Sequence, residues 1–150
     1  MKIIKLGKLV GDWSIVNDTI LQQVKNLFNL ENCNINLNIQ NSNDVLVLTT
    51  DNLENYNIEA PYTVKRIRIH LTDCQPGHFY CYDDEIHVNW RAGDVYTYDW
   101  NKTSYASANA SHHPMMILEL TGVVTEKTTD FINRLKRFDS LQLELSDNSW

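Results

Sequence analysis

The sequence has little that would hold it in a membrane, cross-link it or attract it to nucleic acid. No apolar run approaches the roughly 18 residues that cross a bilayer, and the first residues lack the long apolar stretch of a secretory signal. The three cysteines, Cys33, Cys74 and Cys81, form no Cys-x-x-Cys pair, and their odd number argues against a disulfide framework. The formal charge of −6 disfavours contacts with phosphates. We therefore expect a cytoplasmic protein that binds neither membranes nor nucleic acid.

The length and composition favour a single domain. The 150 residues and their 43% hydrophobic content are sufficient for one core, and no linker or internal repeat divides the chain. We expect residues 1–150 to form one domain whose β-barrel core spans about 33–124. Many short strands at close spacing, with helices only near the N- and C-terminal ends, predict a mainly β fold of the double-stranded β-helix type, a jelly-roll or cupin-like barrel.

The spacing of apolar residues predicts the individual elements. A helical stripe indicates a helix over residues 15–28, and Thr128 can cap a second helix that ends near residue 137. The continuous apolar run Val45–Leu48 is typical of a strand buried on both faces. Further strands are expected within residues 29–43, at 64–71, 79–82, 86–88, 95–98 and 115–120, and at 141–145.

The strand at 64–71 carries the most interesting side chains. Its period of two places Arg66, Arg68 and His70 on one face, with successive side chains about 7 Å apart, and apolar residues on the other. If the cationic face is solvated, it is simply the polar side of an antiparallel sheet. If it points into a barrel, each buried guanidinium must be paired, and its planar fork suits a carboxylate. The pocket would then bind a small acid.

Three short motifs follow one another between Glu59 and Gly122. They are Arg68-Ile69-His70, then Trp90-Arg91-Ala92-Gly93, then Tyr98-Asp99. Their order and spacing resemble the Arg-x-His strand, Trp-x-x-Gly turn and aromatic-Asp pair of the aspartyl/asparaginyl β-hydroxylase family. The resemblance implies a double-stranded β-helix oxygenase that uses Fe(II) and 2-oxoglutarate. It also implies that Arg68 and His70 face the pocket and help to hold the acid cosubstrate.

Other residues stand at the positions where that family binds its metal. Aligned on the Arg-x-His strand, Glu59 occupies the position of the first iron-binding His, and Ser104 is the nearest equivalent of the second. Where the family has an Arg for the distal carboxylate of 2-oxoglutarate, this chain has His113 as the candidate anion contact. A neutral hydroxyl is a poor ligand for Fe(II). The resemblance therefore implies a hydroxylase-like domain with weak activity or none.

The remaining candidates do not form a recognisable catalytic pattern. The cupin arrangement of His-x-His followed by Glu and a later His is absent, and the scattered histidines are more typical of surface positions than of metal ligands. Asp83 and Asp84 are typical of a hairpin turn rather than of paired catalytic carboxylates. Trp13, Trp90 and Trp100 are expected in the core.

Three functions stay open at this point. The first is a diverged Fe(II)/2-oxoglutarate oxygenase that hydroxylates a protein side chain or a small molecule. The second is a pseudoenzyme, the same barrel kept as a non-enzymatic carboxylate-binding or assembly module. The third is a metal-free binder or isomerase of the wider cupin type, since one fold hosts many chemistries. An exposed edge strand could in addition pair two copies into a homodimer.

Overall fold

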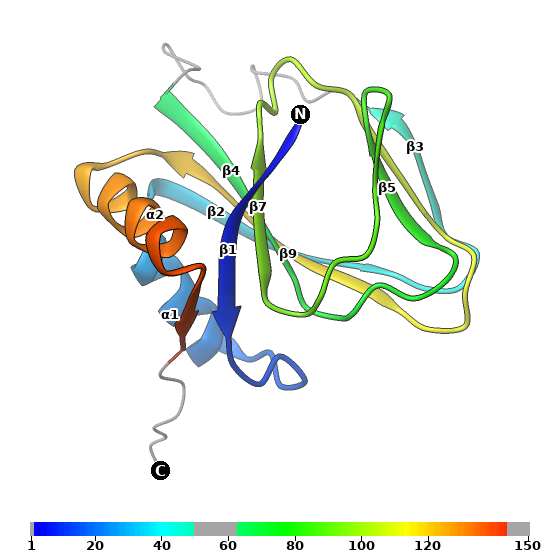
Figure 1. Cartoon of the computed structure of the whole chain (residues 1–150), viewed down its shortest axis with the longest axis horizontal. Helices are drawn as coiled ribbons and strands as arrows, with labels where there is room; N and C mark the ends of the chain where they lie inside the picture. Colours follow the sequence, from blue (N-terminus) through cyan, green and yellow to red (C-terminus); the bar gives the residue numbers. More distant parts are fainter. Residues whose placement is uncertain (1, 50–62, 144–150) are drawn as a thin grey trace.

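The protein folds as two facing β-sheets with two helices against one of them (Figure 1). The structure is a computed structural model and describes residues 2–49 and 63–143. The larger sheet has the strand order β10-β1-β7-β4-β9-β2, and the smaller has the order β3-β8-β5-β6. This mainly β, cupin-like architecture confirms the expected fold class. The elements in chain order are β1 (Ile3–Val10), α1 (Asp18–Phe28), β2 (Glu31–Gln40), β3 (Val45–Thr49), β4 (Val64–His70), β5 (His78–Tyr82), β6 (Glu85–His87), β7 (Asp94–Tyr98), β8 (Tyr105–Asn109), β9 (Met115–Val123), α2 (Glu126–Phe138) and β10 (Ser140–Gln142).

The two faces of the larger sheet have different surroundings, and the alternation along β4 follows from them. Ile67 and Ile69 are fully buried in a core cluster that they share with the apolar faces of α1 and α2, including Phe28 and Phe131. The rings of these two phenylalanines meet edge to face at 4.9 Å. The opposite face of the sheet turns toward the smaller sheet. Because successive strand residues point to opposite faces, Arg66, Arg68 and His70 face the barrel interior.

Both helices begin and end at defined caps. The Asn17 side chain accepts a hydrogen bond from the backbone of Ile20 at the start of α1. The prediction that Thr128 caps α2 is wrong by one turn, because Thr125 is the N-cap and Thr128 is its partner in a reciprocal capping box. Two threonines three residues apart both suit a helix start, so the sequence does not decide between them. Within the described residues, neither helix is both long and apolar enough to cross a membrane.

The apolar run Val45–Leu48 forms a strand, but it is not buried on both faces as its composition predicts. Val45 and Val47 are 67% and 73% exposed, and Leu48 is 63% exposed. The reason is topological. β3 stands at the edge of the smaller sheet and, among the described strands, pairs with β8 alone. An apolar run indicates a strand, but its place in the sheet decides whether its faces are covered.

Candidate functional site

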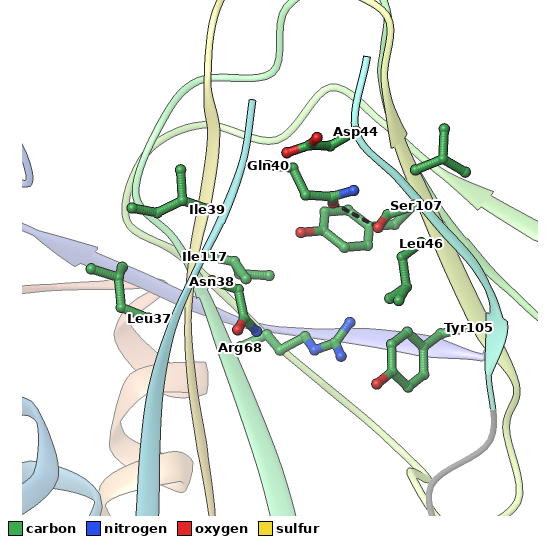
Figure 2. Close-up of a pocket in the computed structure, with 12 residues that line it drawn as sticks. Leu37, Asn38, Ile39, Gln40, Asp44, Leu46, Arg68, Tyr105, Ser107 and Ile117 are labelled. Carbon is green, nitrogen blue, oxygen red and sulfur yellow. Dashed lines mark hydrogen bonds between the residues drawn. The ribbon is translucent and has the colours of Figure 1, made fainter. Parts of the chain in front are cut away.

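A cavity of about 620 Å³ opens between β2 and β3, the two edge strands joined by the turn at 41–44. Figure 2 shows Asn38 and Gln40 on the side of β2 that faces the cavity, whereas Leu37 and Ile39 lie on the other side of this strand. The interior is therefore more polar than the whole set of lining residues suggests. That set is Leu37, Asn38, Ile39, Gln40, Asp44, Val45, Leu46, Arg68, Tyr80, Tyr105, Ser107 and Ile117.

Arg68 is the charged group at the inner end of the cavity, and other side chains hold it in place. It lies directly across from Glu119 in the β4–β9 register. Its Nε donates a hydrogen bond to Glu119 Oε2 at 2.8 Å, its Nη2 lies 2.8 Å from the same oxygen, and its Nη1 donates to the Tyr82 hydroxyl at 3.0 Å. The guanidinium carbon lies 4.5 Å from the centroid of the Tyr105 ring and 5.0 Å from that of Tyr98. Four tyrosine rings surround the cation: Tyr80, Tyr82, Tyr98 and Tyr105.

These surroundings fix the charge states of the groups. Burial by itself would lower the pKa of Arg68, but Tyr82, Tyr98 and Glu119 outweigh it and raise the pKa well above the ordinary value. Burial raises the pKa of Tyr80 and of Tyr82, although the Arg68 charge acts in the opposite direction. The site therefore presents a permanent cation among neutral phenol groups. Because burial raises the pKa of Tyr80 and of Tyr82, both phenols stay protonated near neutral pH and can donate hydrogen bonds.

Arg66 lies on the same face of β4 and shares Glu119 and Tyr98 with Arg68. Its Nε donates to the Thr121 hydroxyl at 2.9 Å and lies 3.6 Å from Glu119 Oε1. Its guanidinium carbon is 5.3 Å from the centroid of the Trp100 ring. Arg66 is not among the residues that line the cavity. On this inward face of β4, Arg68 thus lines the cavity and Arg66 does not.

His70 forms a buried pair with His87 instead of lining the cavity. The two Nε2 atoms are 3.1 Å apart, so one ring donates its proton to the other. The ring of His70 stacks on Trp90 with centroids 4.2 Å apart. Burial lowers the pKa of His70 well below its ordinary value, and it lowers the pKa of His87 to about 4 even though Asp94 and Glu85 oppose the change. Both rings are therefore neutral at pH 7, and within the described residues His70 Nδ1 has no hydrogen-bond partner.

The other residues predicted for the site lie apart from Arg68. The side chain of His113 is exposed, and its carbonyl accepts a hydrogen bond from Asn109 Nδ2. His113 lines a second cavity, of about 450 Å³, with Trp13 among its neighbours. Ser104 is held by its backbone, which exchanges hydrogen bonds with Asp83 at the β5–β6 turn. Glu59 lies outside the described residues. The structure thus brings Arg68 and His70 to one face and does not add His113 to them.

The described residues do not fit an Fe(II) centre. Nowhere among residues 2–49 and 63–143 do three or more His, Cys, Asp or Glu side chains lie close enough together to hold a metal ion. His70 and His87 offer two nitrogens that point at each other, and Ser104 belongs to the hairpin turn. A non-haem iron site needs imidazole and carboxylate ligands around an open position.

Residue-by-residue inspection of the sequence missed the main partner of Arg68. Glu119 is the single charged residue in the apolar segment Met115–Leu120, and this isolated charge was a usable signal. A charged residue at a core position needs a partner of opposite charge. The tyrosines of the cage gave no such signal, because aromatic residues are ordinary in strands.

The comparisons with known proteins concern the fold. No family model and no curated protein matches the chain. A nickel complex of ThoJ, described as a non-heme monooxygenase, is 16% identical with a TM-score of 0.48, and the match covers 61% of this chain and 42% of that one. A Cupin 2 conserved barrel domain protein from Salinispora arenicola CNS-205 is 11% identical with a TM-score of 0.42, and the match covers 88% of this chain and 82% of that one. The chain thus spans less than half of the monooxygenase, and no activity follows from either likeness.

Proposed function

We propose that the protein is a binding module that holds a small carboxylate in the cavity between β2 and β3. The observation that carries the proposal is the position of Arg68, which lines this cavity while 3% of its surface is exposed. A guanidinium has five N–H donors, more than its contacts with Glu119 and Tyr82 use. A ligand carboxylate is the kind of group whose geometry matches the remaining donors.

The surroundings of Arg68 support the binding of a small polar acid. Because the tyrosine cage and Glu119 fix the guanidinium, little rotamer entropy is lost when a ligand arrives. Asn38 and Gln40 contribute amide groups along β2, and Tyr105 contributes a ring on the opposite wall (Figure 2). Leu46 and Ile117 leave room for a short apolar portion of the ligand. The site thus combines one fixed cation, several polar groups and a modest apolar surface.

Ligand-induced thermal stabilisation tests this proposal. We expect small monocarboxylates to raise the melting temperature, because a ligand that binds only the folded state stabilises it by mass action. Asn38→Leu fills the polar wall of the cavity and should weaken binding by about tenfold or more. Asn36→Leu is the matched control, since Asn36 is an exposed residue two positions away on the same face of β2 and does not line the cavity. The proposal would be contradicted if monocarboxylates raised the melting temperature of both variants equally, or if they did not raise that of the unsubstituted protein.

A second proposal is a residual aspartyl/asparaginyl β-hydroxylase-like activity. The observation in its favour is that Arg68 and His70 lie buried on the same face of β4. The resemblance to the hydroxylase family implies that these two residues help to hold the cosubstrate. The pairing of Arg68 with Glu119 and the donor set around His70 weigh against it. The carboxylate-binding proposal is therefore the one that the geometry supports best.

Anaerobic titration with Fe(II) and 2-oxoglutarate separates the two proposals. For a binding module we expect neither a visible charge-transfer band nor succinate release once air is admitted, because the described donors do not complete an iron site. A band that requires both additions, together with succinate release, would favour the hydroxylase. Zn(II) in place of Fe(II) is the control, since zinc has no redox chemistry and gives no such band.

A further inference from the structure

Two carboxylates set the charge of the cavity that Arg68 lines. Glu119 is 7% exposed and neutralises the guanidinium at the inner end. Asp44 lines the cavity beside Gln40, at the turn between β2 and β3 (Figure 2). Its Oδ2 accepts a hydrogen bond from the backbone of Asn41 at 2.7 Å, which fixes the carboxylate at this turn. Among the described residues that line the cavity, Arg68 is the one cation.

We propose that Glu119 and Asp44 are specificity-determining residues that restrict the cavity to ligands with a single carboxylate and reject dicarboxylates. The inference rests on the proposed function and names the class of ligand for the same site. The buried cluster of Arg66, Arg68 and Glu119 holds two guanidinium groups and one carboxylate, so one ligand carboxylate at Arg68 balances its charge. A second would be desolvated without a counter-ion, which is unfavourable. Asp44 would repel it as well.

Arg66 does not remove this restriction. Its guanidinium lies over Trp100 and its Nε is bonded to Thr121, outside the set of residues that line the cavity. Its Nε lies 3.6 Å from Glu119 Oε1, whereas Arg68 contacts Oε2, so the two guanidinium groups share this one carboxylate. Because Arg66 is 1% exposed and does not line the cavity, it offers no contact to the second carboxylate of a ligand there.

The alternative is that both carboxylates have structural roles only. Glu119 would then serve to neutralise a buried arginine, and Asp44 would serve to close the turn at 41–44. Such roles affect stability, but they do not make the cavity distinguish one ligand charge from two. The decisive measurement is therefore a ratio of affinities for two ligands of equal shape, not the stability of a variant.

Succinate and succinamate supply this pair, because they differ only in one carboxylate replaced by an amide. We expect the unsubstituted protein to bind succinamate about tenfold or more tightly than succinate in calorimetric titrations at pH 7. Asp44→Asn should raise succinate affinity and leave succinamate affinity unchanged, since the new amide oxygen can still accept from Asn41. Glu119→Gln should raise the affinity for succinate further. Asp73→Asn is the control, because Asp73 is an exposed acid that lines the other cavity.

The outcomes are distinguishable from a failure of the proposed function. If the unsubstituted protein binds succinate as tightly as succinamate, the charge restriction is wrong and carboxylate binding stands. If it binds neither ligand nor any smaller monocarboxylate, the proposed function fails and the restriction fails with it. If Glu119→Gln does not fold, two measurements still test the restriction. They are the ratio of succinamate to succinate affinity in the unsubstituted protein and the succinate affinity of Asp44→Asn, a variant that keeps the turn because Asp44 is exposed.

Discussion

Arg68→Met should lower the free energy of unfolding by about 3–5 kcal/mol, the range measured when one partner of a buried ion pair is removed. Met keeps the unbranched part of the side chain up to the position of Nε, so the substitution removes the charged guanidinium head and its hydrogen bonds. Glu119 would remain buried without its hydrogen bond from Arg68 Nε at 2.8 Å, and Arg66 at 3.6 Å is too distant to replace it fully. Chemical denaturation with an unchanged m-value measures this loss directly.

A double-mutant cycle shows whether the loss comes from the ion pair. Arg68→Met combined with Glu119→Leu removes both charges, and we expect the double variant to be more stable than Arg68→Met alone. Arg91→Met is the matched control, since the Arg91 side chain is 72% exposed and pairs with Asp73 at 3.7 Å. Its effect should stay within about 0.5 kcal/mol. If the double variant instead loses the sum of what the two single variants lose, Arg68 and Glu119 are not coupled.

The orientation of β4 could be predicted from the sequence, but the partners of its side chains could not. Strict alternation in Arg66–His70 assigns the charged and apolar residues to opposite faces, because the side-chain period of a strand is two. Whether the charged face is solvated depends on a second sheet that the local pattern does not reveal. The Arg68–Glu119 contact joins residues 51 positions apart. It follows from the β4–β9 register, which the hydrophobic pattern of either strand alone leaves open.

Two strands gave no usable local signal, and each has a physical reason. In β1, the register shifts between Lys5 and Gly7, so the alternation of buried and exposed residues is interrupted. After Tyr105, strand β8 consists of Ala106, Ser107, Ala108 and Asn109, whose small side chains do not resemble those of a half-buried strand. Both strands form because their neighbours in the sheets pair with them. Ser107 could therefore not be foreseen as part of the cavity.

The histidine pair predicts a loss of stability in acid. In the unfolded chain His87 titrates near pH 6.5, whereas burial lowers its folded-state pKa to about 4. As the pH falls from 6.5, the unfolded state therefore takes up a proton that the folded state does not, and folding becomes less favourable until the folded protein is also protonated near pH 4. His70 acts in the same direction, because its folded-state pKa is also lowered by burial. Above pH 6.5 the pair has no further effect.

Between pH 6.5 and 4 we expect His87 alone to contribute a loss on the order of 3 kcal/mol, since each pKa unit corresponds to about 1.4 kcal/mol. His87→Gln should flatten this dependence, because it removes one titrating group while its amide can still bond to His70 Nε2. His112→Gln is the control, as His112 is exposed and should leave the profile unchanged. Denaturation at a series of pH values compares the three proteins. Parallel profiles for His87→Gln and the unsubstituted protein would mean that His87 is protonated as readily when folded as when unfolded, and that its contact with His70 at 3.1 Å does not hold it neutral.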